Sequence, residues 1–515
     1  MKTIRVLQLG AADFSRTLRI IDGTDWYYEP GLSQEAEDAP KEFELAILDR
    51  EITEEEFSVL ARSLRAYTLF ATERAALEED GWARRLMARK KGKRISAEEL
   101  RVLLEKDLPD YFAGSYGEKI PPQEMALALG FQGSVFWEGY EGLHLRGDFG
   151  SELLQIVSWR INTPIESGQA LEYWLEYKKD ASVEIRLEIA VLMYGYGTIP
   201  EISKVWSFSE KDMEDMIYIE NPEKRTGRTF VSLKARGQGE LTIGALHSHY
   251  SRRGRGCFLP GGQRRVTSER EEVFYYFDPG DLTPPLNVYF SGYKTKEGFE
   301  GYGIMKNLGH PFLLITDTRL EGGAAYMGSE EYERTLEQII RDRMQELGFQ
   351  NTEVILSGIS MGSFGALYYG CKIQPHAVIA GKPLVSFGDI AENERINRPG
   401  GFPTSLDVLH KFCGGLSRRA ADRLNQKFWD TFDGTQWSHT EFALAYMIED
   451  DYDNTAYEKL LSHLKGTSIK IYGKGLHGRH NDDTPGIVNW FLDQYQRILE
   501  EDFEGNRTET AGRKS

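Results

Sequence analysis

The sequence predicts a mixed α/β fold in three parts: a small α/β domain over residues 1–125, an antiparallel β-sandwich over 126–280, and a larger α/β domain over 281–515. Three observations predict it. Short apolar runs flank a Glu-rich helical stretch in the first hundred residues. From about Val135, apolar and polar residues alternate with a period of two, which is typical of half-buried strands. After Pro284, apolar strands alternate with amphipathic helices, which is typical of a parallel sheet.

The first part contains three apolar runs that we expect to form strands, over residues 4–9, 44–48 and 66–70, with a helix over 53–64. This order predicts a small parallel sheet. Gly10 and Asp49 follow two of the strands, as in a dinucleotide-binding fold, but the second and third glycines of G-x-G-x-x-G are absent. We therefore assign this part a structural and docking role.

The charge of the chain bears on its partners. The 80 acidic against 62 basic residues give a formal net charge of −18, which argues against a nucleic-acid binder. The one strongly basic run covers residues 84–94. We interpret it first as a solvated helix face; contact with a membrane surface or an acidic partner would be made there.

The second part contains several short strand-like runs separated by turn residues. Such spacing predicts an antiparallel sandwich. The expected strands cover residues 143–147, 153–160, 170–177, 183–192, 229–234 and 241–247. Tryptophans in this part are expected mainly in the core, although an exposed one beside polar groups would suit stacking on a sugar. They are Trp137, Trp159, Trp174 and Trp206.

The third part alternates strands and helices. We expect strands over residues 286–290, 311–317, 354–356, 377–380, 442–448 and 468–472. Helices are expected over 330–347, 456–464 and 485–499. The polar, Gly-rich segment at about 384–440 is predicted to be an irregular excursion over the sheet, and the polar tail from Glu504 to be frayed.

The cysteines and the N-terminus bear on location. The chain has three cysteines, widely spaced and without a CxxC pair, which predicts neither a disulfide framework nor a metal site. The first residues enter a strand-like run without the apolar region of a signal peptide, and no apolar segment is long enough to span a bilayer. We therefore expect a cytoplasmic protein.

The motif that carries chemistry is G-x-S-x-G, here Gly358 to Gly362, between an apolar strand and a helix-compatible run. A serine on such a sharp turn has strained backbone angles, and glycines on both sides avoid clashes. We expect Ser360 to be the nucleophile, because the turn exposes its hydroxyl and aims the following amide at a developing oxyanion. The candidate oxyanion-hole donors are the backbone N–H groups of Met361 and of Gly292 or Tyr293.

An acid and a histidine follow the motif in the order that an α/β-hydrolase-like domain requires, each after a predicted strand. His480 and His477 compete for the role of base, and we prefer His480 because it lies just before the closing helix. The candidate acids are Asp450, which we prefer, then Asp451, with Asp453 and Glu449 behind them.

With these residues in place, the chain resembles the second accessory secretory proteins of the accessory Sec system of Gram-positive bacteria, which exports serine-rich-repeat adhesins. The motif GISMGSFGALYYG, the late acid and GLHGRHND carry the resemblance, which covers essentially the whole chain. It implies a cytoplasmic protein that works with two sister accessory proteins and the accessory SecA motor ATPase. It also implies O-acetyl transfer to N-acetylglucosamine on the serine-rich-repeat glycoprotein, with Ser360, Asp450 and His480 as the matching triad.

Two other functions fit the same residues. A serine esterase or glycan deacetylase would use the triad with water as acceptor, since a G-x-S-x-G motif does not report which acceptor the site binds. A non-catalytic export scaffold would keep the triad only as a vestige. The resemblance implies an acetyl donor without identifying it, and we expect no tightly bound cofactor and no metal.

Overall fold

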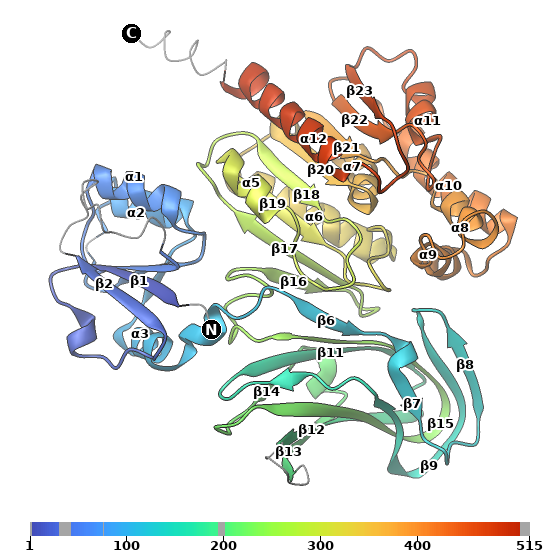
Figure 1. The fold of residues 1–515 in the computed structure, drawn as a ribbon, viewed down its shortest axis with the longest axis horizontal. Helices are drawn as coiled ribbons and strands as arrows, with labels where there is room; N and C mark the ends of the chain where they lie inside the picture. The colour runs from blue at the N-terminus through green and yellow to red at the C-terminus, as the bar shows by residue number, and fades with distance from the viewer. Residues whose placement is uncertain (1–2, 30–42, 76, 194–200, 505–515) are drawn as a thin grey trace.

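The computed structural model describes residues 3–29, 43–75, 77–193 and 201–504, and its strands form three sheets. Figure 1 shows the N-terminal sheet at one side, the second sheet below and the third above it. No helix in the described ranges is long and apolar enough to cross a membrane. The predicted tail after Glu504 lies outside these residues.

The N-terminal sheet has five parallel strands in the order β2-β1-β3-β4-β5. They are β1 (Ile4–Leu9), β2 (Thr24–Glu29), β3 (Leu45–Leu48), β4 (Leu69–Thr72) and β5 (Lys93–Ile95). The prediction missed β2 and β5, which are short or only half-buried. It also began β4 three residues early, because Tyr67 has φ 66°, which breaks the extended run.

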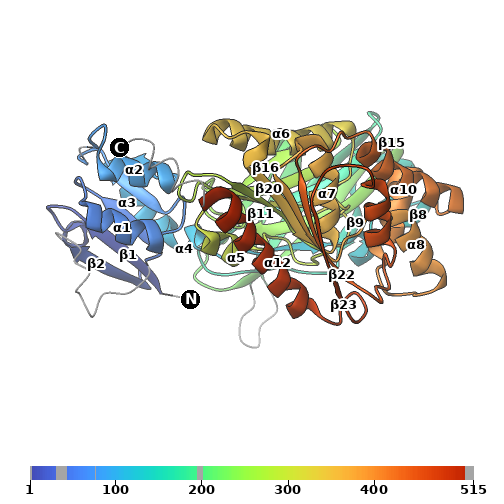
Figure 2. The same ribbon diagram turned by 90° about the horizontal axis from the view of Figure 1, so that it is seen from above.

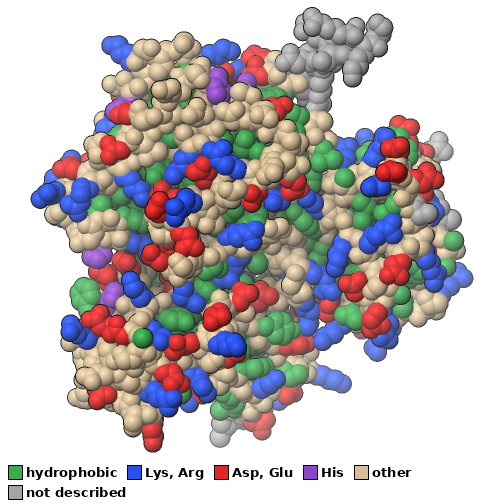
Figure 3. All heavy atoms as spheres, turned by 180° about the vertical axis from the view of Figure 1, so that it is seen from behind, with side chains coloured by type: hydrophobic (Ala, Val, Ile, Leu, Met, Phe, Trp, Pro, Cys, Tyr) green, Lys and Arg blue, Asp and Glu red, His purple; other side chains and the backbone are tan. Residues whose placement is uncertain are grey.

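Helices cover both faces of this sheet, so alternate strand residues meet two separate cores. The helices are α1 (Glu54–Ser63), α2 (Trp82–Arg89), α3 (Ala97–Val102) and α4 (Leu108–Tyr111), with a π-helical turn at Leu103–Asp107. Thr53 and Ser96 begin α1 and α3 with capping boxes. The basic run 84–94 spans the end of α2 and strand β5. On the face drawn in Figure 3, basic and acidic side chains are interspersed.

The second sheet is antiparallel, and two of its strands are much longer than predicted. β9 (Gly142–Trp159) takes in both runs predicted at 143–147 and 153–160, and β15 (Gly227–Tyr250) takes in those at 229–234 and 241–247. The division of each into two strands was wrong. Gly150 and Gly237 adopt positive φ where the β9–β15 register shifts, so they bend these strands without ending them.

The remaining strands extend from this long pair in two layers (Figure 1). β12 pairs with the first half of β15 and β11 with its second half, and both halves share one apolar core. Trp159 and Trp174 are buried, whereas Trp137 is 42% exposed. The strands are β6 (Gly117–Ile120), β7 (Met125–Leu127), β8 (Ser134–Glu138), β10 (Pro164–Ile165), β11 (Ala170–Lys179), β12 (Val183–Met193), β13 (Glu201–Ser209) and β14 (Ile217–Glu220).

The third sheet has eight strands in the order β16-β17-β19-β18-β20-β21-β22-β23. It has an α/β-hydrolase-like topology in which β17 runs antiparallel to both of its neighbours and the pairings from β19 to β23 are parallel. The sheet begins before the predicted boundary at 281, because the fully buried strand β17 pairs with β19. The strands are β16 (Gln263–Val266), β17 (Glu272–Asp278), β18 (Leu286–Phe290), β19 (Phe312–Thr316), β20 (Val354–Ile359), β21 (Ala377–Gly381), β22 (Glu441–Met447) and β23 (Ile471–Leu476).

Helices α5 (Tyr302–Leu308) and α12 (Thr484–Ile498) cover one face of this sheet (Figure 2), and α6 (Glu330–Leu347), α7 (Met361–Ile373) and α11 (Ala456–His463) pack into the core on the other. The bounds of β18 and α6 confirm the predicted ones. β23 begins three residues later than predicted.

The excursion at 384–440 is helical, so the prediction of irregular structure was wrong. It contains α8 (Phe387–Ile396), α9 (Thr404–Cys413) and α10 (Arg418–Asp433), which we call the cap. Each helix buries one apolar stripe in the core of the third sheet. The Gly-rich breaks near Gly400 and Gly414 keep these helices short, which hides their periodicity in the sequence.

Candidate active site

Ser360 occupies the strained turn between β20 and α7. Its backbone has φ 55° and ψ −122°, a conformation that is unfavourable for a residue with a side chain. The flanking glycines are required by contact: a Cβ on Gly358 would lie 2.2 Å from the carbonyl oxygen of Gly362, and one on Gly362 would lie 2.1 Å from that of Phe290. The turn thus has the shape that the motif predicted.

Ser360, His480 and Asp450 form a hydrogen-bonded chain. Ser360 Oγ lies 2.8 Å from His480 Nε2, and His480 Nδ1 lies 2.8 Å from Asp450 Oδ2. The histidine and the aspartate are buried, with 1% and 6% of their surfaces exposed. The serine follows β20, the aspartate follows β22 and the histidine follows β23, so strands of the parallel run β20-β21-β22-β23 place all three at one edge of the sheet.

Asp450 is held as a carboxylate. Burial acts to raise its pKa, but the hydrogen bond from His480 and those from the backbone N–H groups of Tyr452 and Asp453 outweigh it, so the pKa is lowered. An ionised Asp450 fixes the proton of His480 on Nδ1, which leaves Nε2 free to accept the proton of Ser360.

The competing candidates have other partners. His477 is exposed and pairs with Glu449, 3.1 Å away. Asp451 accepts the backbone N–H of His480 and pairs with Arg398. Asp453 is buried and accepts the N–H groups of Val385 and Ser386, where the cap leaves the sheet. The structure therefore brings Asp450 and His480 to Ser360, and gives each alternative a different contact.

Asp453 yields a pH-dependent prediction. Burial raises its pKa to about 6, above its ordinary value of 3.8, so its contribution to stability is fully present below pH 4 and is lost as the pH rises through 6. We expect Asp453→Asn, which keeps an oxygen acceptor, to remove roughly 2–3 kcal/mol of the difference in unfolding free energy between pH 7 and pH 4. Urea denaturation at pH 7 and pH 4 measures the unfolding free energy of both proteins. If that free energy changed equally with pH in the wild type and in Asp453→Asn, the prediction would be wrong.

The predicted oxyanion hole is only partly available. Met361 is the first residue of α7, so its amide is among those that the helix leaves unpaired. Tyr293 lies on the wall of the pocket at Ser360. The N–H of Gly292, however, donates to the carboxylate of Glu300 at 2.7 Å, so this predicted donor already has an anionic partner. A sequence motif does not show that the carboxylate of Glu300, eight residues later, already accepts a hydrogen bond from the Gly292 N–H.

We expect removal of Glu300 to speed acylation, because its negative charge lies where a second negative charge would develop. Glu300→Ala should raise the rate of acylation by p-nitrophenyl acetate roughly three- to tenfold, measured as p-nitrophenol release. Glu300→Gln, which keeps an acceptor for Gly292 without the charge, is the matched variant and should behave alike. A tenfold fall in both would mean that Glu300 positions the loop instead.

A pocket of about 600 Å³ opens at Ser360, and sequence reasoning missed most of its lining. Lys382 is buried in its wall, at the end of β21; its Nζ donates to Thr484 Oγ1, and burial lowers its pKa. Its position after an apolar strand was the signal that could have found it. Other missed residues of the lining are Tyr140, Glu300, Glu321, Phe402, Tyr452 and Asn481.

A larger cavity, of about 680 Å³, lies between the N-terminal sheet and the second sheet. Its lining includes Ile21, Phe112 and Arg253 but neither Ser360 nor His480. Because no serine and histidine meet there, it is not the candidate active site.

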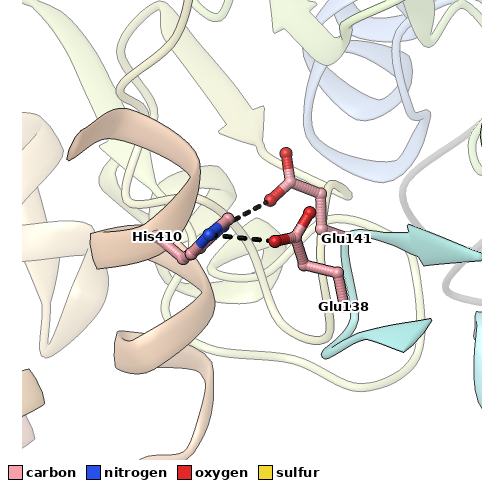
Figure 4. A group of neighbouring side chains, drawn as sticks. All are labelled: Glu138, Glu141 and His410. Carbon is pink, nitrogen blue, oxygen red and sulfur yellow. Dashed lines mark hydrogen bonds and ion pairs between the residues drawn. The ribbon is translucent and has the colours of Figure 1, made fainter. Parts of the chain in front are cut away.

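One group of side chains in the described ranges has the spacing of metal ligands: Glu138, Glu141 and His410, whose donor atoms lie within 4.8 Å of one another. Figure 4 shows both carboxylates pointing at the imidazole ring. Nε2 of His410 lies 2.9 Å from Glu138, and Nδ1 lies 3.3 Å from Glu141. Since each ring nitrogen already has a carboxylate partner, we interpret the group as a polar contact that links the second sheet to helix α9.

The loop that carries Gly292 and Tyr293 is anchored to the second sheet. Glu297 of this loop pairs with Gly117 through the backbone, and its carboxylate contacts the ring of His247, which is wholly buried. Burial acts to lower the pKa of His247, but Glu297, Glu176 and Glu272 outweigh it and raise the pKa to about 10. His247 is therefore a buried cation that holds the loop in place.

Comparisons with known proteins agree with this architecture. A family model described as the accessory Sec system GspB-transporter matches residues 4–505. The chain is 40% identical over 508 residues to the second accessory secretory protein of the accessory Sec system of Streptococcus gordonii, covering 97% of this chain and 98% of that protein. It is 44% identical over 398 residues to the protein of the same name from Staphylococcus aureus (strain NCTC 8325 / PS 47), covering 76% and 74%.

A solved structure matches nearly the whole fold. It is that of the glycosylation associate protein (Gap123) complex from Streptococcus agalactiae, in which one chain aligns with a TM-score of 0.86 and 35% identity. The match covers 98% of this chain and 99% of that chain, so all three sheets have counterparts there.

Proposed function

The chain belongs to the accessory Sec system GspB-transporter family, that of the second accessory secretory proteins, and we propose that it transfers O-acetyl groups to N-acetylglucosamine on a serine-rich-repeat glycoprotein that this system exports. The observation that carries the proposal is the hydrogen-bonded chain of Ser360, His480 and Asp450 on a strained turn. This arrangement is the one that acyl transfer through a serine ester requires.

The proposed reaction has two halves. Ser360 Oγ attacks the carbonyl carbon of the acetyl donor while its proton passes to His480 Nε2; the donor's leaving group then departs with that proton, and an acetyl ester remains on the serine. A sugar hydroxyl next gives its proton to His480 and attacks the ester, and Ser360 leaves and recovers the proton. Asp450 stabilises the imidazolium in both halves.

The proposed partners follow from the family. They are two sister accessory secretory proteins, the accessory SecA motor ATPase and the serine-rich-repeat glycoprotein, met on the cytoplasmic side before export. The Gap123 complex supports the first of these, because a chain of the same fold is part of that assembly. The acetyl donor is a substrate that enters and leaves, so the proposal needs no tightly bound cofactor.

Mass spectrometry of the adhesin's glycan tests the function. Cells carrying Ser360→Ala should export an adhesin whose N-acetylglucosamine lacks O-acetyl groups, and cells carrying His477→Ala should not differ from wild type. Unchanged acetylation in the Ser360→Ala strain would favour the scaffold function, in which the triad is vestigial.

We expect complex formation to be independent of catalysis, because the first two sheets carry neither Ser360 nor its partners and offer separate surfaces. Pull-downs of the sister accessory proteins with the Ser360→Ala protein should recover the wild-type amounts. Loss of the sister proteins, with circular dichroism unchanged, would contradict the separation of docking from catalysis.

A further inference from the structure

The second sheet reaches the pocket at Ser360 through one residue. Tyr140 lies at the turn between β8 and β9, in the segment 138–141 that we call the Tyr140 hairpin. Every other residue of the described lining comes from the third sheet, its loops or its cap. The pocket is therefore completed by a part of the chain more than 200 positions away from Ser360 in sequence.

The Tyr140 hairpin is fixed in place by helix α9. The backbone N–H of Tyr140 donates to Asp407 at 2.9 Å. One helical turn further along α9, the ring nitrogens of His410 contact the carboxylates of Glu138 and Glu141 (Figure 4). Gly139 permits this approach, because a Cβ there would lie 1.9 Å from Asp407 Oδ1. Anchored on both sides of its tip, the hairpin holds Tyr140 at the pocket before any ligand arrives.

Glu321 joins three segments at this end of the pocket. Thr404 of the cap donates to it at 3.4 Å. Burial and the negative charge of the neighbouring Glu321 carboxylate raise the pKa of Tyr140 and of Tyr293. Both phenols therefore stay protonated at neutral pH and remain donors, beside an acceptor carboxylate.

An aromatic wall connects this polar end to the catalytic histidine. The rings of Tyr293 and Phe402 have centroids 5.7 Å apart, those of Phe402 and Tyr452 are stacked at 5.5 Å, and Tyr452 lies 4.3 Å from the ring of His480. These rings pack edge to face or stacked on one another, so they form an apolar wall rather than a free flat face. Such a wall, ending in phenols and a carboxylate, suits a ligand with an apolar face and a hydroxyl-rich edge. A pyranose ring has that form, and water needs none of these contacts.

We infer that the end of the pocket formed by Tyr140, Tyr293 and Glu321 is the acceptor subsite for a pyranoside, and that Tyr140 sets the preference for a sugar hydroxyl over water. This inference rests on the proposed function, since it concerns the second half of that reaction. The subsite holds the glycoside so that one hydroxyl faces the serine ester and His480, which takes its proton. With the subsite impaired, water attacks the same ester and releases acetate.

The test separates transfer from hydrolysis in the full-length protein. With p-nitrophenyl acetate as donor and methyl N-acetyl-β-glucosaminide as acceptor, p-nitrophenol release measures ester formation and mass spectrometry measures the acetylated glycoside. Tyr140→Ala and Glu321→Gln should each lower the ratio of acetylated glycoside to free acetate about tenfold or more. Tyr140→Phe, which keeps the ring but loses the hydroxyl, should fall between. Phe136→Ala is the matched control, because Phe136 lies just before the same hairpin, is 60% exposed and is outside the pocket.

A binding measurement distinguishes failure of the acceptor-subsite proposal from failure of the proposed acetyl transfer. In the Ser360→Ala protein, saturation-transfer NMR should detect the glycoside, and the added Tyr140→Ala change should abolish the signal while Phe136→Ala leaves it. A wild-type transfer ratio or an unchanged NMR signal in the Tyr140 variants would overturn the subsite and leave the proposed function standing. Failure of Ser360→Ala to reduce p-nitrophenol release would instead overturn the proposed function, and the acceptor role with it.

Discussion

Ser360→Ala and His480→Ala should each lower kcat for acetyl transfer on the order of 10⁴-fold or more, and the double variant should lose little beyond either one. Ser360 Oγ and His480 Nε2 lie 2.8 Å apart and share one hydrogen bond. Loss of either atom therefore abolishes the same step, the proton transfer from serine to histidine that generates the nucleophile. Steady-state kinetics on the purified proteins measures the three values. If the fold-losses in kcat of the two single variants multiplied in the double variant, Ser360 and His480 would not act as a single catalytic unit.

Two neighbours serve as controls for this prediction. His477→Ala should stay within twofold of wild type, because that ring is exposed and pairs with Glu449 rather than with the serine. Asp450→Asn should lower kcat by orders of magnitude, since the amide no longer selects the productive tautomer of His480. If His477→Ala lost activity and His480→Ala kept it, the assignment of the base would be wrong although the turn at Ser360 would stand.

The predicted site residues came together because each depends on local sequence. The strained turn at Ser360 needs glycines two positions to either side, and Asp450 and His480 each follow a strand of one parallel sheet. Parallel strands bring their carboxyl ends to one edge, so residues 90 to 120 positions apart become neighbours once the strand order is known. Asp451 and Asp453 could not be excluded in this way, because they follow the same strand and differ only in where their side chains point.

The remainder of the pocket depends on contacts that leave no local pattern. Tyr140 reaches the site because Gly139 allows the hairpin to meet Asp407, a contact between two separate parts of the chain. The amide of Gly292 is taken by Glu300 across a loop without regular structure. The cap was missed for a related reason: three helices of 10, 10 and 16 residues, broken by glycines, give windows too short for a clear helical period.

A buried ion cluster supports the loop that leads to Glu321. Arg319 follows β19 and is 4% exposed; its guanidinium donates to both carboxylate oxygens of Asp317, at 2.9 and 2.8 Å, and to Glu271 at 2.7 Å. Asp317 also accepts the N–H groups of Ala324 and Tyr326, which shapes the loop toward the pocket. Burial acts to raise the pKa of Asp317, but Arg319 and these hydrogen bonds outweigh it and lower the pKa.

Arg319→Met should therefore destabilise the protein by about 3–5 kcal/mol at pH 7, because it leaves Asp317 and Glu271 buried without a cation. The loss should shrink as the pH falls. With Arg319 present, the lowered pKa of Asp317 gives stability that is present above pH 4 and lost below it; without Arg319, burial raises that pKa, so the variant regains stability as the carboxyl is protonated. Urea denaturation at pH 7 and pH 5 measures both effects.

Glu330→Ala, at an exposed ion pair with Arg334, is the matched control and should change stability by less than about 1 kcal/mol. A loss in Arg319→Met that is equal at both pH values would mean that packing against Tyr332, rather than charge, holds this loop.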